Sequence, residues 1–80
     1  MHTVRFGNSE VEVADVADTL AAARVLEFRD IPADTPFASV IIPDGGDWSS
    51  ALLSINPQAG AVSASLVACV LEYARTLVAE

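Results

Sequence analysis

The sequence contains no lysine, one cysteine and one histidine among its 80 residues. The lone Cys69 excludes an internal disulfide and argues for a reducing compartment rather than a small disulfide-bonded secreted domain. His2 has no second histidine and no neighbouring cysteine, so it cannot build a metal site or a Ser-His or Cys-His pair. We therefore expect a protein that is not an enzyme and that needs no metal or other cofactor.

Glycine motifs for phosphate binding are also missing. Gly45, Gly46 and Gly60 match neither the dinucleotide-binding fingerprint nor the P-loop. Asp44 and Asp47 flank the Gly-Gly pair as carboxylates do in a calcium loop, but the further oxygen ligands of such a loop are absent. A turn over residues 43–47 is the better interpretation.

Basic residues are scarce, because four arginines face eleven acidic residues and leave a formal charge of -7. Binding to nucleic acid or to an anionic membrane needs several basic side chains on one face, so we expect neither ligand. A basic protein surface fits the charge through complementarity and steering. The alternative is that the charge only keeps the protein soluble.

Long apolar runs are missing as well. The longest apolar-rich stretch, Leu66 to Leu71, is too short to span a bilayer, and residues 1–5 lack the apolar core of a signal peptide. We expect a single domain over residues 1–80 in the cytoplasm of a bacterial host cell. Its core is made mostly of Ala and Val with five aromatics, for which a stability of about 4–12 kcal/mol is typical.

The first half of the chain changes its pattern near residue 15. Residues 3–6 and 9–13 alternate around Gly7-Asn8, which predicts a β-hairpin with one apolar face: Val4, Phe6, Val11 and Val13. Beyond it, apolar residues recur at helical spacing. They predict a helix from Asp15, as its N-cap, to Glu27 or Phe28.

The second half predicts strands and a final helix. Residues 37–42 contain a Val-Ile-Ile run that is typical of a central strand buried on both faces. Residues 48–55 are interpreted as a strand, with a short helix capped by Asp47 as the alternative. Residues 61–66 predict a further short strand, unless Ser63 caps the last helix early. That helix is expected from about Val67 to Val78.

These elements give the order ββαβββα. Short links favour hairpins, so we expect a two-layer α+β sandwich. It would consist of a mostly antiparallel sheet of about five short strands, with two helices on one face.

Two groups of residues are candidate contact surfaces. The first is acidic and comprises Glu10, Glu12, Asp15 and Asp18. Residues two apart on a strand project from one face about 7 Å apart, so such a row can imitate phosphates to a nucleic-acid-binding protein. The second is Trp48 with Asp44 and Asp47, an aromatic anchor with an acidic rim. The alternatives are that the acids solvate a sheet face and a helix start, and that Trp48 covers the core edge.

In size, charge and lack of catalytic residues, the chain resembles the small acidic inhibitors encoded by phages, anti-CRISPR proteins among them. This resemblance implies a protein that occupies a basic, nucleic-acid-binding surface of a larger protein or complex. An immunity protein or antitoxin that neutralises a toxin is one alternative. A monomer or weak homodimer is expected. A self-assembling subunit would bury a sheet face bearing Leu52 and Val40 or Ile42.

Overall fold

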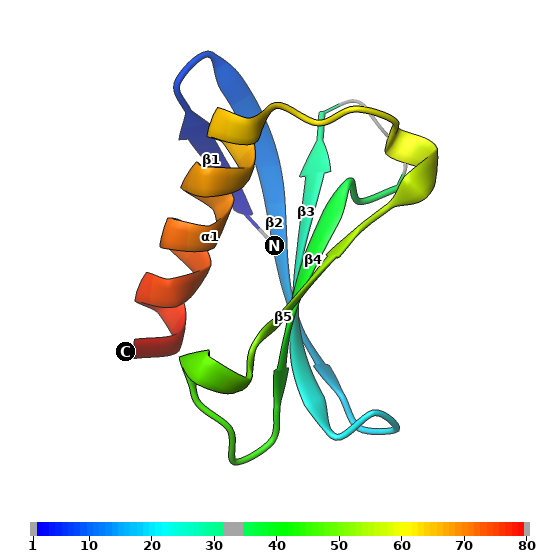
Figure 1. The fold of residues 1–80 in the computed structure, drawn as a ribbon, viewed down its shortest axis with the longest axis vertical. Coiled ribbons are helices and arrows are strands. Elements are labelled where there is room, and N and C mark those ends of the chain that lie inside the picture. The colour runs from blue at the N-terminus through cyan, green and yellow to red at the C-terminus, as the bar shows by residue number, and fades with distance from the viewer. Residues whose placement is uncertain (1, 32–34, 80) are drawn as a thin grey trace.

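The computed structural model describes residues 2–31 and 35–79. Within these residues one antiparallel sheet contains five strands, in the order in which they follow along the chain. Its strands are β1 (His2–Phe6), β2 (Ser9–Asp18), β3 (Ala23–Asp30), β4 (Ala38–Pro43) and β5 (Leu52–Ile55). Short 3-10 turns precede and follow β5, namely η1 (Trp48–Ser50) and η2 (Pro57–Ala59). The helix α1 (Ala64–Ala79) packs along one face of the sheet (Figure 1).

The α+β class and the antiparallel sheet are confirmed, but the order ββαβββα and the second helix are wrong. The expected helix from residue 15 to residue 28 is instead the end of β2, a turn and β3. The residues that suggested one helical face do not share a face. Leu26 is buried, whereas Leu20 lies in the turn and is 99% exposed.

The segment that was expected to be helical is extended because the alternation of buried and less buried side chains, which is typical of a strand, continues past residue 13. In β3, Leu26 and Phe28 are buried, and the residues between and beside them are only half-buried. Asp15, the expected N-cap, lies within β2. Asp18 accepts hydrogen bonds from the N–H groups of Leu20 and Ala21, at 3.1 Å each, and so closes the β2–β3 turn. Ala22 completes the turn with a positive φ of 51°.

The C-terminal half differs from the expectation in two places. Residues 48–55 contain both of the predicted elements, a short helix and a strand, because Asp47 caps the short η1 and β5 follows it. Residues 61–66 do not form a strand. Instead, the Ser63 hydroxyl accepts the Leu66 N–H at 3.3 Å, and α1 begins at Ala64. The strand count of five is therefore reached with different segments.

The predicted first hairpin is confirmed. Val4 lies opposite Val11, and Arg5 opposite Glu10. The core lies between α1 and the face of the sheet that the helix covers, here called the helix-side face. Its largest fully buried side chains are Val11, Val13, Leu26, Phe28, Val40 and Val70. The opposite face, here called the open face, carries no helix, so β4 is buried on one side only, and the prediction of burial on both faces is wrong.

Candidate protein-binding surfaces

Each of the four arginines, all of which lie in the described ranges, forms an ion pair with one carboxylate. The pairs are Arg5–Glu10 at 2.6 Å, Arg24–Asp15 at 2.7 Å, Arg29–Glu12, and Arg75–Glu72 at 2.6 Å. Five further acids of the described residues form no ion pair with an arginine: Asp18, Glu27, Asp30, Asp44 and Asp47. Asp34 and Glu80 lie outside the described residues. Within the described ranges, the unpaired negative charge therefore resides on these five side chains.

The first candidate surface is divided between the two faces of the sheet. The strand register places Glu10 and Glu12 on the open face, beside Arg5 and Arg29. Each of the two carboxylates is therefore paired with an arginine of a neighbouring strand, Glu10 with β1 and Glu12 with β3. Carboxylates that are already paired offer less attraction to a cationic partner than unpaired ones.

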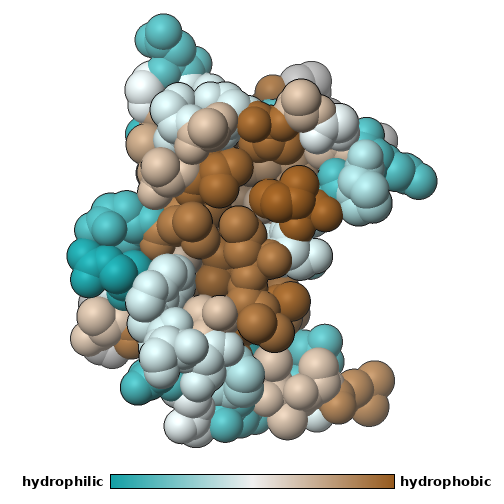
Figure 2. Space-filling model, in the orientation of Figure 1, coloured by the Kyte–Doolittle hydropathy of each residue, from teal (hydrophilic) through white to brown (hydrophobic). Residues whose placement is uncertain are grey.

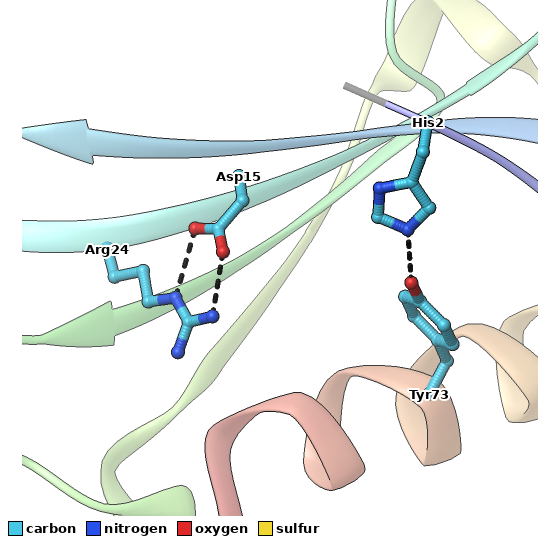
Figure 3. A network of polar contacts seen from close by, with 4 residues as sticks. All are labelled: His2, Asp15, Arg24 and Tyr73. Carbon is cyan, nitrogen blue, oxygen red and sulfur yellow. Dashed lines mark hydrogen bonds and ion pairs between the residues drawn. The ribbon is translucent and has the colours of Figure 1, made fainter. Parts of the chain in front are cut away.

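Asp15 lies on the helix-side face, away from Glu10 and Glu12. Both of its carboxylate oxygens accept hydrogen bonds from Arg24, at 3.0 and 2.7 Å (Figure 3). This bidentate contact lowers the pKa of Asp15 below its ordinary value of 3.8. On the same face, a hydrogen bond joins His2 Nε2 and the Tyr73 hydroxyl and links β1 to α1 (Figure 3). His2 thus has a structural partner on the helix.

Three unneutralised carboxylates gather where the β2–β3 turn meets the β4–η1 loop. The Asp44 N–H donates to the Ala22 carbonyl oxygen at 2.8 Å, and this bond holds the two turns together. Asp18 lies in register with Ala23, which in turn lies opposite Pro43. Two strand spacings separate Asp18 from Pro43, or about 10 Å. We call Asp18, Asp44 and Asp47 the acidic end.

Within the acidic end, local hydrogen bonds favour the charged form of Asp47. Asp47 accepts hydrogen bonds from the hydroxyl and the N–H of Ser49, and these lower its pKa. Trp48 follows Asp47 directly, is half-buried and packs against the core. The structure thus joins Asp18 to the second candidate surface, a proximity that the sequence did not indicate.

An apolar region lies between α1 and β5 and was missed by the sequence reasoning. Figure 2 shows apolar side chains gathered in the middle of this face, with hydrophilic ones around its rim. Two exposed residues of β5 belong to this region: Leu53 is 41% exposed and Ile55 38%, and the register places them beside Val40 and Ala38 on the helix-side face. Leu52, which is 62% exposed, lies beside Ile41 on the open face. The self-assembly alternative expected Leu52 and either Val40 or Ile42 on an exposed sheet face. Leu52 is exposed, but Val40 and Ile42 are buried.

A signal for this region was present in the sequence. No charged residue occurs from Trp48 to Leu71, a run of 24 residues in a chain with fifteen charged ones. The run supplies η1, β5, η2 and the first half of α1. The segment that forms η1, β5, η2 and the first half of α1 therefore carries no charged side chain.

Other candidates for chemistry stay weak in the described part of the chain. Cys69 is exposed on α1, although its position beside apolar residues favours a buried thiol; the buried residue is its neighbour Val70. Among residues 2–31 and 35–79, no group of three or more His, Cys, Asp or Glu side chains is placed to hold a metal ion. Over the same residues, no helix is long and apolar enough to cross a membrane.

Comparison with known proteins found no matching family model, no matching curated protein and no matching solved structure.

Proposed function

We propose that this chain is a non-enzymatic inhibitor that binds a basic, nucleic-acid-binding surface of a larger protein, as anti-CRISPR proteins do. The observation that carries the proposal is the pairing of every arginine with a carboxylate, which leaves five described acids for an external cation: Asp18, Glu27, Asp30, Asp44 and Asp47. Because all four arginines are paired within the domain, its remaining carboxylates can attract the Lys and Arg side chains of a partner. Its place of action is the cytoplasm of a bacterial host.

The acidic end is the part of the surface that supports this function best. Asp18, Asp44 and Asp47 project from two turns that one backbone hydrogen bond fixes together, so their spacing is set before binding. Preorganised groups lose little conformational entropy on association. Trp48 beside them supplies apolar contact area. Glu10, Glu12 and Asp15 are also proposed to contact the partner. Each of them must first give up its ion pair with an arginine of this chain before it can pair with a cation of the partner.

Affinity capture from the host at low salt identifies the partner, and a salt gradient tests the mechanism. Binding should weaken steeply as salt rises. Association rates are then measured for a triple variant, Asp18→Asn, Asp44→Asn and Asp47→Asn, in which each amide retains an acceptor oxygen for the turn. We expect the rate to fall about tenfold or more.

A matched control removes two charges that no arginine pairs with and one paired charge, all outside the proposed contact, with Glu27→Gln, Asp30→Asn and Glu72→Gln. This control should slow association less than the triple variant of the acidic end does. A partner complex that is insensitive to salt, or equal losses in both variants, would contradict the proposed contact. An antitoxin would show the same residue dependence but with a toxin as the captured protein, ideally one encoded beside it.

A further inference from the structure

The sheet has two edges, β1 and β5, and they differ in how they are protected. β1 carries Arg5 and lies against α1, where Tyr73 stacks edge-on with Phe6 at a centroid distance of 5.7 Å. β5 carries no charged residue and no proline, and all four of its residues are exposed. We propose that β5 pairs with the β5 strand of a second copy of this chain, to form one continuous antiparallel sheet. This inference is independent of the proposed function.

The backbone of β5 offers hydrogen-bonding groups at its outer side. The Asn56 N–H donates to the Phe37 carbonyl oxygen at 2.9 Å. This bond determines which residues of β5 direct their backbone groups toward β4 and which direct them away from it. Since successive residues direct their backbone groups to alternate sides, Ser54 bonds toward β4. Leu53 and Ile55 therefore present their N–H and C=O groups to the free edge. Such groups are a template for another strand.

Electrostatics favours a copy of the same chain at this edge and at no other place. Two molecules of charge -7 repel each other wherever carboxylates face one another. The uncharged run from Trp48 to Leu71 is where they can approach without that repulsion, and β5 lies within it. An antiparallel edge is also its own complement across a two-fold axis, so no second sequence is required.

The alternation of the ladder fixes a specific arrangement. With the axis at Ser54, Leu53 of one protomer bonds to Ile55 of its partner, and the reverse pair forms symmetrically. The two Ser54 residues then face each other as a non-hydrogen-bonded pair, with Cα atoms about 4.5 Å apart. On the helix-side face, Leu53 and Ile55 of both copies become neighbours, so the exposed apolar region of Figure 2 loses part of its contact with water.

Sedimentation equilibrium over a concentration series tests the pairing. The mass should rise from 8.4 kDa toward twice that value as concentration increases. Ile55→Lys places a charge on the edge and should weaken self-association at least tenfold. Leu20→Lys is the matched control: it makes the same charge change at a residue that is 99% exposed in the β2–β3 turn, and it should leave the mass profile unchanged. A monomer at about 1 mM, or equal profiles for both variants, overturns the proposal.

Cross-linking tests the register directly. In a chain with Cys69→Ser, the substitution Ser54→Cys should give a disulfide-linked dimer on mild oxidation, because the Cα separation suits a disulfide. Leu20→Cys in the same background should remain mostly monomeric. Cross-linking of both variants to the same extent would contradict the arrangement.

Salt separates this proposal from the proposed function. Self-association should strengthen as salt rises, because screening weakens repulsion between like-charged copies. Binding to a basic partner should change in the opposite direction. Each proposal can therefore fail while the other stands.

Discussion

At the scale of single residues, the pair Asp15–Arg24 makes a specific contribution to acid stability. Both side chains are more than a third exposed, so the pair is worth less than about 1 kcal/mol despite its bidentate geometry. Because the pKa of Asp15 is lowered in the folded protein, the contribution is fully present above pH 4 or so. It is lost as the pH falls through the folded value.

Asp15→Asn should therefore lower the free energy of unfolding at pH 7 by about 0.5 kcal/mol. At a pH below the lowered pKa of Asp15, the variant and the parent should be nearly equal, since both then carry a neutral side chain. Urea unfolding at the two pH values measures the difference. A loss of stability that does not change with pH would show that packing, and not charge, explains the effect.

At the scale of elements, the β2–β3 turn contains the described non-glycine residue with a positive φ, Ala22 at 51°. An L-residue in the left-handed region is strained by contact between its Cβ and the backbone, and glycine avoids this. Ala22→Gly should therefore raise the free energy of unfolding by about 0.5–1 kcal/mol. Ala21→Gly in the same turn is the control and should be neutral or destabilising. Thermal unfolding of both variants makes the comparison, and equal effects would contradict the explanation.

The same turn shows why the sequence predicted the wrong element there. Ala21-Ala22-Ala23 has high helical propensity, and Val16, Leu20, Ala23 and Leu26 recur at helical spacing. The strand pattern was present too, because Leu26 and Phe28 are separated by Glu27. Pairing of β3 with both β2 and β4 determined the outcome, and such long-range partners are not visible in local propensity.

The hairpin of β1 and β2 was predictable, since Gly7-Asn8 and the alternation around it depend only on neighbours in the chain. The same holds for α1, whose apolar stripe is long. The acidic end was not predictable, because Asp18 and Asp44 are brought together by a hydrogen bond between two turns. The charge-free run from Trp48 to Leu71 was visible in the sequence, but only the sheet order shows that it contains a free edge.

At the scale of the whole molecule, a formal charge of -7 on 80 residues means that the excess carboxylates repel one another. Screening by salt should relieve this repulsion more than it weakens the four exposed ion pairs. Near pH 7, raising the salt concentration from about 10 mM to about 200 mM should therefore raise the Tm by several degrees, since about 1 kcal/mol corresponds to 4–8 °C in a domain of this size.

Calorimetry on the Ile55→Lys variant measures this effect without a contribution from self-association. At about pH 3 most carboxylates are neutral, so the rise in Tm with salt should shrink. A rise of the same size at both pH values would exclude carboxylate repulsion as its cause.

Every strand of the sheet pairs with the strand that directly precedes or follows it in the chain, and α1 comes after all five. During synthesis on the ribosome, each hairpin can therefore close soon after its second strand emerges. The apolar side that α1 covers nevertheless stays bare until the helix has been translated. The nascent protein is thus most exposed to aggregation, and most in need of a chaperone, in the interval between the end of β5 and the docking of Tyr73 on Phe6 and Phe28.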